Sequence, residues 1–418
     1  MKIKRWIFLS WIGLTIFILG VILIINPKIP TQIELGTAEI INKITGYDIH
    51  TIWVDIIFIT VGFVLIIIGI LKWFKSIYEV AVPYRKKDLV DVVYDERKLA
   101  QGVKIVTIGG GTGLSSLLRG LKSQTSNIAA VVTVADDGGS SGRLRKEMGV
   151  LPPGDIRNCL VALADEENLM SELFQYRFHD SESLEGHSFG NLLLAAMTDI
   201  SGSFDTAVKQ SSKILAIKGR VLPATLYQST LCAVMEDDEV VRGESSITHD
   251  ERKIKKVFLE PEYCKPLDEV IEAISESDFI VLGPGSLYTS VIPNLLVDGV
   301  ISAITNSKAV TLYVCNVMTQ PGETDGFSAS DHLKTLKKHA QEIRIDYCLV
   351  NDEIPSPTLQ EKYKLENAYP VPADVEEIEK MGVKPIKASL ISQTNLVRHD
   401  PAKLSDGITK LIMDANVK

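Results

Sequence analysis

A glycine-rich segment is the clearest chemical feature of the chain. The apolar segment 104–109 runs into four glycines, and a helical pattern follows them directly. Glycine lacks a Cβ and adopts positive φ at low cost, so the N–H groups of such a loop can approach an anion at the N-terminus of the next helix. The residues expected to cradle a phosphate are Gly109, Gly110, Gly111, Thr112 and Gly113.

The spacing of these glycines matches neither standard phosphate-binding fingerprint. In G-x-G-x-x-G, the last glycine is replaced here by Leu114 or Ser116, and the Gly-Lys-Ser/Thr of a P-loop does not follow. The segment therefore predicts an anion-binding turn of an α/β domain without naming its ligand. A tight strand-to-helix turn that binds no ligand is the alternative.

Two adjacent carboxylates, Asp136 and Asp137, stand at the end of the next apolar segment. A carboxylate beside a phosphate repels it unless Mg²⁺ bridges the two or a sugar hydroxyl lies between them. Arg143 and Arg145 follow and could supply donors to an oxyanion. The pair is a candidate for a Mg²⁺ site, and an ordinary Asp-Asp-Gly-Gly turn is the alternative.

A second glycine loop closes the apolar segment 279–282, with hydroxyl side chains near a predicted helix start. Two such loops at strand ends of one sheet can converge on one anion, although helix capping alone would also explain Ser286 and Thr289. The residues expected to contact the ligand are Gly283, Pro284, Gly285 and Ser286.

Two further segments place polar residues before a helix or after a strand. In Gly-His-Ser-Phe-Gly-Asn, Asn191 is expected to face the ligand, whereas His187 fits a structural hydrogen bond better than an acid–base role. The loop after 309–315 gathers residues where substrate contacts usually cluster, namely Asn316, Gln320, Glu323, Thr324 and Asp325.

The elements that must position these residues follow an α/β pattern. Apolar, strand-like segments alternate with helical stretches and predict a mostly parallel sheet with helices on both faces. Short alternating segments between Gly219 and Glu260, including Val240–Ile247, predict a small antiparallel insertion. The predicted strands of the main sheet are 104–109, 128–134, 279–283, 309–315 and 345–350.

The 418-residue chain is 45% hydrophobic, and much of this excess lies near the N-terminus. Two apolar runs, about 6–26 and 54–74, are long enough to cross a bilayer as a helical hairpin. The first carries no charge, and the second is uncharged from Ile56 to Leu71. Basic residues flank the hairpin and predict an inner-membrane protein with both termini in the cytoplasm. We therefore expect a hairpin over 1–78, a linker over 79–100 and one ligand-binding domain over 101–418.

Charge and cysteine content exclude several other classes. The net charge of -9 argues against a nucleic-acid surface. Five scattered cysteines without C-x-x-C spacing fit a reducing compartment and suggest neither a disulfide framework nor a zinc site.

Six motifs in order give the chain a specific resemblance. They are I-G-G-G-T-G-L-S at 108–115, V-A-D-D-G-G-S-S-G-R-L-R at 134–145, P-P-G-D-I-R-N at 152–158, G-H-S-F-G-N at 186–191, G-P-G-S-L-Y-T-S at 283–290 and C-N-V-M-T-Q-P-G-E-T at 315–324. The set resembles the bacterial gluconeogenesis factor family, a relative of 2-phospho-L-lactate transferase. The usual family pattern has no membrane hairpin, so the N-terminus departs from it.

The resemblance implies a Rossmann-like domain that binds UDP-sugars such as UDP-N-acetylglucosamine and regulates carbon metabolism together with cell-wall synthesis and cell shape. It also implies that both glycine loops hold the nucleotide, that Asp136 and Asp137 occupy the metal position, and that Arg398 neutralises the diphosphate. As partners we expect the membrane, cell-wall synthesis proteins and a further copy of the chain, and no nucleic acid.

Two functions from different classes remain open at this point. The leading hypothesis is a membrane-anchored UDP-sugar-binding regulator. The alternative is a Mg²⁺-dependent transferase that moves a phosphate-bearing group from a nucleotide diphosphate donor to a hydroxyl acceptor. An NAD-dependent oxidoreductase is weakened by the broken G-x-G-x-x-G spacing and the Asp pair.

Overall fold

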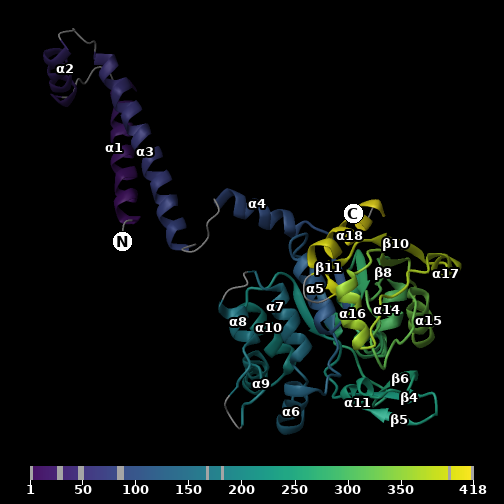
Figure 1. The fold of residues 1–418 in the computed structure, drawn as a ribbon. Coiled ribbons are helices and arrows are strands. Elements are labelled where there is room, and N and C mark those ends of the chain that lie inside the picture. The colour runs from purple at the N-terminus through teal and green to yellow at the C-terminus, as the bar shows by residue number, and fades with distance from the viewer. Residues whose placement is uncertain are drawn as a thin grey trace. The chain divides into compact units, whose positions relative to one another are not determined.

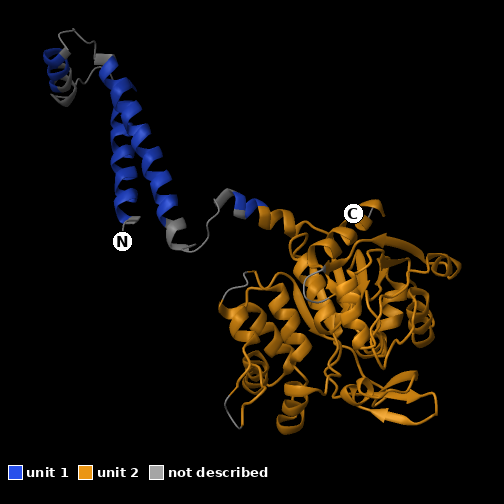
Figure 2. Ribbon diagram, viewed as in Figure 1, with its two compact units in different colours: residues 1–94 blue, residues 95–418 orange. Residues whose placement is uncertain are grey.

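The computed structural model forms two compact units, residues 1–94 and 95–418 (Figure 2). It describes residues 3–25, 32–45, 51–81, 89–165, 169–179, 183–393 and 397–415. The basic residues Arg85, Lys86 and Lys87, which contribute to the topology prediction, lie outside the described residues.

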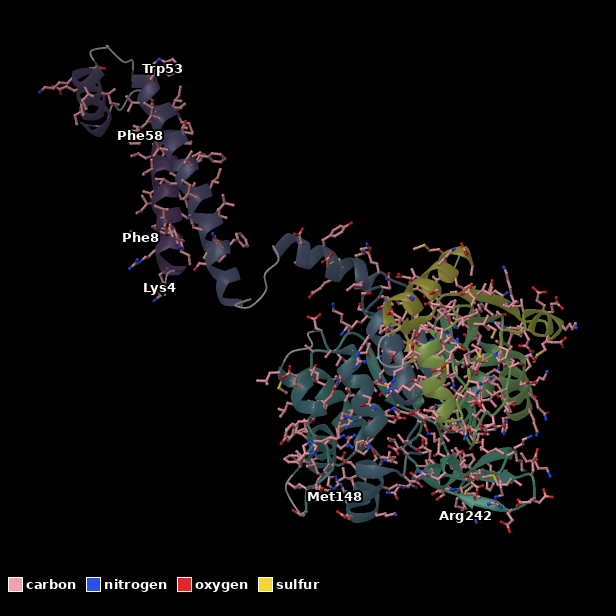
Figure 3. The ribbon with its side chains drawn as sticks, viewed as in Figure 1. Lys4, Phe8, Trp53, Phe58, Met148 and Arg242 are labelled. Carbon is pink, nitrogen blue, oxygen red and sulfur yellow. The ribbon has the colours of Figure 1, made fainter. Side chains whose placement is uncertain are left out.

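The first unit contains the two predicted apolar helices, α1 (Ile3–Ile25) and α3 (Thr51–Ala81), with α2 (Gln32–Thr45) between them in sequence. By length and composition, Lys4–Ile25 and Trp53–Ser76 could each cross a membrane. Apolar side chains such as those of Phe8 and Trp53 point outward from the pair (Figure 3).

Glycines let α1 and α3 approach each other closely. A Cβ added to Gly62 would lie 2.5 Å from the backbone nitrogen of Phe17 and 2.7 Å from the carbonyl oxygen of Gly13. Close backbone approach at small residues is a common packing mode of membrane helices, because lipid gives little hydrophobic drive for association. Further along the chain, α4 (Leu89–Ala100) lies within the segment predicted as a linker.

The second unit is built on a seven-stranded sheet in the order β10-β9-β8-β7-β1-β2-β3, with every neighbouring pair parallel. The predicted α/β fold is therefore confirmed. Two strands of the sheet, β3 and β10, were not predicted from the sequence. The strands are β1 (Ile105–Gly109), β2 (Ile128–Val132), β3 (Arg220–Pro223), β7 (Phe279–Leu282), β8 (Val310–Val314), β9 (Tyr347–Asn351) and β10 (Lys384–Ala388).

Helices cover both faces of this sheet and form two apolar cores (Figure 1). Alternate residues of one strand enter different cores, as Ile280 and Val281 do, so the strand is buried on both faces. The helices, including the short π-helix η1, are α5 (Gly111–Leu121), α6 (Gly139–Met148), α7 (Gly154–Leu163), α8 (Leu169–Gln175), α9 (Phe189–Ser201), α10 (Phe204–Ile214), α12 (Asp268–Ser275), η1 (Leu287–Val291), α13 (Ile292–Leu295), α14 (Val300–Asn306), α15 (Ala329–His339), α16 (Pro357–Leu365), α17 (Val375–Lys380) and α18 (Pro401–Asp414).

The predicted antiparallel insertion is present and consists of β4 (Thr230–Met235), β5 (Val240–Arg242) and β6 (Ile254–Glu260) in the order β5-β4-β6. The expected strand Val240–Ile247 is wrong beyond Arg242. Gly243 adopts φ +94°, which ends the strand and starts the short helix α11 (Glu244–Thr248). A separate hairpin near the C-terminus joins β11 (Ile391–Gln393) to β12 (Val397–His399).

Candidate functional site

A cavity of about 470 Å³ lies beyond the carboxyl ends of β1, β7 and β8. The chain runs outward from β1 to β2 on one side and from β7 to β8 on the other, so the cavity lies at the point where the strand order reverses. Open parallel sheets bind ligands at such points. The loops after the three strands line it together with residues of α11, α16 and β12.

The first glycine loop forms one wall and is in direct contact with the second. A Cβ added to Gly113 would lie 2.8 Å from the carbonyl oxygen of Pro284 and 3.0 Å from the nitrogen of Gly285. Asn294, fully buried beneath them, donates from Nδ2 to the carbonyl oxygens of Gly109 at 3.1 Å and Ser290 at 2.7 Å. The two predicted loops therefore converge, and Asn294 ties their bases together.

A carboxylate takes one donor of the first loop. The backbone N–H of Gly111 donates to Asp155, and a Cβ at Gly110 would lie 2.5 Å from Asp155 Oδ2. Burial, with a smaller contribution from nearby Asp136, raises the pKa of Asp155 to about 6. Sequence reasoning quoted the Pro-Pro-Gly-Asp segment but gave Asp155 no role, because its position at the loop depends on tertiary folding.

The second loop is also engaged within the protein. The N–H of Gly285 donates to Asn316 Oδ1 at 3.3 Å, and the Ser286 hydroxyl donates to Glu323 Oε2. Gly283 and Gly285 adopt φ +80° and +156°, conformations that disfavour other residues. Gly285, Ser286, Asn316 and Glu323 all line the cavity, whereas Gly283 and Pro284 lie behind it at the loop contact.

The two predicted metal ligands have different surroundings. Asp137 Oδ1 accepts from the backbone N–H of Ser245 at 2.8 Å, which anchors α11. Asp136 Oδ1 accepts from Gly138 N–H at 2.8 Å, and its carboxyl also hydrogen-bonds Glu244, a residue that lines the cavity. Burial first, and then Asp136, raise the pKa of Glu244 well above its usual range. Among the described residues, no three His, Cys, Asp or Glu side chains are grouped as a metal site.

Asn191 does not line the cavity. Its Nδ2 donates to Ser140 Oγ at 3.1 Å, and that hydroxyl lies 3.0 Å from His187 Nδ1. Ser188 caps α9 by accepting from the Asn191 N–H. These buried contacts give His187 the structural role expected from its place before a helix.

Arg398 lines the cavity, and its expected role of neutralising a diphosphate stays a prediction. Within the described residues its side chain donates no hydrogen bond and forms no ion pair, so its charge is available to a ligand. The neighbouring His399 is buried, and burial lowers its pKa to about 4. Tyr363, which the sequence did not identify, lines the cavity and accepts a hydrogen bond from the Val397 N–H through its hydroxyl oxygen at 2.9 Å.

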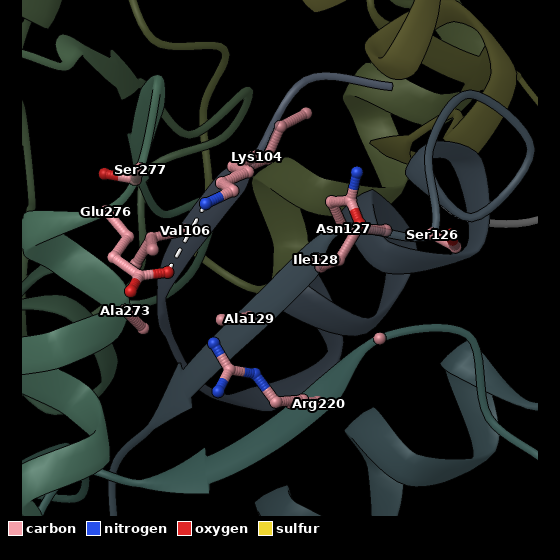
Figure 4. Close-up of a pocket in the computed structure, with 12 residues that line it drawn as sticks. Lys104, Val106, Ser126, Asn127, Ile128, Ala129, Arg220, Ala273, Glu276 and Ser277 are labelled. Carbon is pink, nitrogen blue, oxygen red and sulfur yellow. Dashed lines mark hydrogen bonds and ion pairs between the residues drawn. The ribbon is translucent and has the colours of Figure 1, made fainter. Parts of the chain in front are cut away.

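A second cavity, of about 360 Å³, lies at the opposite end of the strands, by the amino ends of β1, β2 and β3 (Figure 4). Lys104, Asn127 and Arg220 are among its lining residues. Lys104 Nζ is 3.4 Å from Glu276 Oε2 in an exposed pair. No sequence motif pointed to this cavity.

Comparison with known proteins assigns the class. Residues 105–391 match the family described as 2-phospho-L-lactate transferase CofD, and the chain belongs to this family. Gluconeogenesis factor of Bacillus subtilis is 50% identical over 317 residues, which cover 76% of this chain and 100% of that protein. The crystal structure of a UPF0052-family protein from Bacillus halodurans superposes with a TM-score of 0.72 at 51% identity, covering 74% of this chain and 99% of that one.

The long N-terminus is shared with part of the family. A Nostoc relative with the gluconeogenesis factor name is 46% identical across 98% of this chain and 90% of its own length. The N-terminal hairpin therefore distinguishes this chain from the B. subtilis protein, as expected, but not from the Nostoc protein.

Proposed function

We propose that the cavity at the carboxyl ends of the strands binds a UDP-sugar, with UDP-N-acetylglucosamine as the principal ligand. The observation that carries this proposal is the meeting of two glycine loops around one cavity with Arg398, which has no side-chain partner among the described residues. Loop N–H groups and a guanidinium suit a diphosphate, and a volume of about 470 Å³ is within the range of small-molecule sites.

The chain would then act as a membrane-anchored regulator of gluconeogenic growth and cell-wall synthesis. The names of its relatives support the metabolic part of this role, and the two apolar helices support the anchor. A sensor of a wall precursor would gain from a position at the inner face of the membrane, where lipid-linked precursors are made. Both termini would be cytoplasmic, as the basic flanks of the hairpin favour.

Ligand identity is tested by thermal unfolding of the full chain in detergent with UDP-N-acetylglucosamine and other UDP-sugars, GDP, ATP and NAD, each with and without Mg²⁺. A ligand at one hundred times its Kd adds about 2.7 kcal/mol to the stability of the folded state. UDP-N-acetylglucosamine is expected to give the largest rise in Tm. Stabilisation by NAD or GDP, with no response to any UDP-sugar at millimolar concentration, would refute the assignment.

A second candidate function is transfer of a phosphate-bearing group, favoured by the family match and by the carboxyl groups of Asp136 and Glu244 beside the loops. Oxygen ligands of this type suit Mg²⁺, which when bound would neutralise a leaving diphosphate. The loop N–H groups and Arg398 would orient the donor. If the wild type consumes a nucleotide-linked donor with Mg²⁺ and a folded D136N/D137N variant is at least about a hundredfold slower, the protein is an enzyme.

A further inference from the structure

We propose that Glu323 determines ligand specificity in this cavity: its carboxylate excludes phosphate from the second glycine loop and accepts a hydrogen bond from a hydroxyl or N–H of the sugar nucleotide. This inference rests on the proposed function and assigns a role to one cavity residue.

The position of Glu323 is that of an internal anion. Glu323 belongs to the loop after β8, and its carboxylate lies against the start of η1. There it accepts from the Ser286 hydroxyl and from the backbone N–H of Tyr288. These are the donors that a phosphate would use at a helix N-terminus. Because Glu323 already takes them, the second loop does not provide a free anion cradle. Phosphate is then directed to Arg398 and to N–H groups of the first loop other than that of Gly111, which donates to Asp155.

Glu323 nevertheless keeps acceptor capacity. The Thr289 hydroxyl lies 2.7 Å from Ser286 Oγ and 3.4 Å from Glu323 Oε1, and its single hydrogen favours the closer oxygen. Two donors, from Ser286 and Tyr288, then serve a carboxylate that has about four lone-pair positions. Glu323 is 5% exposed and lines the cavity, so a ligand donor can use the remaining capacity.

Burial explains why such a contact should discriminate between ligands. A buried carboxylate that lacks a donor pays a desolvation penalty, so a ligand that offers a hydroxyl or N–H there is favoured over one that offers an oxyanion. The side of the cavity at Glu323 would thus receive the uncharged part of the ligand, away from the diphosphate.

The experiment distinguishes the effect of the charge of Glu323 on ligand binding from the effect of its side-chain length. Kd values of the full chain in detergent are measured by calorimetry for UDP-N-acetylglucosamine, UDP and inorganic pyrophosphate. E323Q removes the charge and keeps the length, whereas E323D keeps the charge and shortens the side chain. E342Q is the matched control, because Glu342 is an exposed glutamate that does not line the cavity.

Both Glu323 variants are expected to weaken UDP-N-acetylglucosamine binding by about tenfold, which is the loss of one buried hydrogen bond to a charged group. E323Q should also strengthen pyrophosphate binding by at least about threefold, whereas E323D should leave it unchanged. E342Q should change the binding of neither ligand. If UDP loses as much affinity as the sugar nucleotide, the donor lies in the nucleoside. A loss confined to UDP-N-acetylglucosamine places it in the sugar.

The proposal is overturned if both Glu323 variants bind the sugar nucleotide within about twofold of wild type, or if all three ligands weaken in parallel with the Tm. Failure of the proposed function is a different result, since the wild type would then bind no UDP-sugar. In that case the pyrophosphate measurements still decide whether Glu323 excludes phosphate, and an unchanged pyrophosphate Kd in E323Q rejects the proposal.

Discussion

Cavities lie at both ends of the parallel strands, at their amino-terminal edge and at their carboxyl-terminal edge. Both are lined by basic side chains, but a helix ends beside one and a helix begins beside the other. At the amino-terminal edge, α12 ends at Ser275 beside the lining residues Glu276 and Ser277. At the carboxyl-terminal edge, α5 begins at Gly111, which lines the larger cavity. A helix carries partial positive charge at its N-terminus and partial negative charge at its C-terminus.

This difference shows why basic side chains alone do not identify an anion site. The amino-terminal edge holds Lys104 and Arg220, yet its helix end and Glu276 oppose an anion. The carboxyl-terminal edge offers Arg398 together with loop N–H groups whose direction the backbone fixes. Direction of the strands, set by the parallel topology, therefore decides which cavity suits a diphosphate.

The largest expected effect tests this contrast with one arginine from each edge. R398A should weaken UDP-N-acetylglucosamine binding by about a hundredfold, because a charge-assisted contact to a diphosphate is lost, whereas R220A should leave the Kd unchanged. Calorimetry on both full-length variants measures the two values. Equal losses in R398A and R220A would contradict the assignment of the site to the carboxyl-terminal edge.

A smaller effect is expected from separating the two glycine loops. The Cβ of G113A would lie 2.8 Å from the Pro284 carbonyl oxygen, so the loops must move apart, at a cost of about 2 kcal/mol in the free energy of unfolding and with weaker ligand binding. G407A, in α18, is the control. Its Cβ would meet its nearest neighbours, Leu349 and Leu390, at 3.9 Å, which is ordinary van der Waals contact. Urea unfolding gives both values, and an unaffected G113A would show that the loop contact is not tight.

Local sequence patterns predicted the parts of this site that depend on the backbone. A strand followed by glycines and a helix specifies its own turn, so the loops at 109–113 and 283–286 could be placed at one edge before the structure was known. The same reasoning found the five central strands. It also identified Arg398, although only through the family resemblance.

The residues that sequence reasoning missed reach the site through tertiary folding. Glu244 arrives on a helix that begins because Gly243 ends a strand, and Asp155 approaches the glycines from α7. Asn191 lies outside the lining of the larger cavity and hydrogen-bonds Ser140, since its helix packs against α6. Its expected contact with the ligand stays a prediction. Whether a donor remains free depends on partners far away in sequence; the Ser286 hydroxyl, for example, is taken by Glu323.

The pH dependence of stability gives the next prediction. Burial lowers the pKa of His399 to about 4, below its value near 6.5 in the unfolded chain, so its contribution is present above pH 6.5 and is lost as the pH falls toward 4. From pH 7 to pH 5, this group should cost the wild type about 2 kcal/mol. H399N should remove that part of the decline, and H249N, a change at an exposed histidine, should not. Denaturant unfolding at the two pH values measures the difference; equal slopes in wild type and H399N would contradict it.

The smallest effect is expected at the amino-terminal edge, where Lys104 and Glu276 form an ion pair with both side chains more than half exposed. Solvent screening limits such pairs, so a double-mutant cycle over K104A and E276A should give a coupling below about 1 kcal/mol that decreases further in high salt. None of the three variants should alter binding of UDP-N-acetylglucosamine, because both residues lie at the far edge of the sheet from the glycine loops. A change in ligand affinity in any of them would mean that the two edges are coupled. The amino-terminal cavity would then influence ligand binding at the carboxyl-terminal cavity through the strands, and the two could not be treated as independent sites.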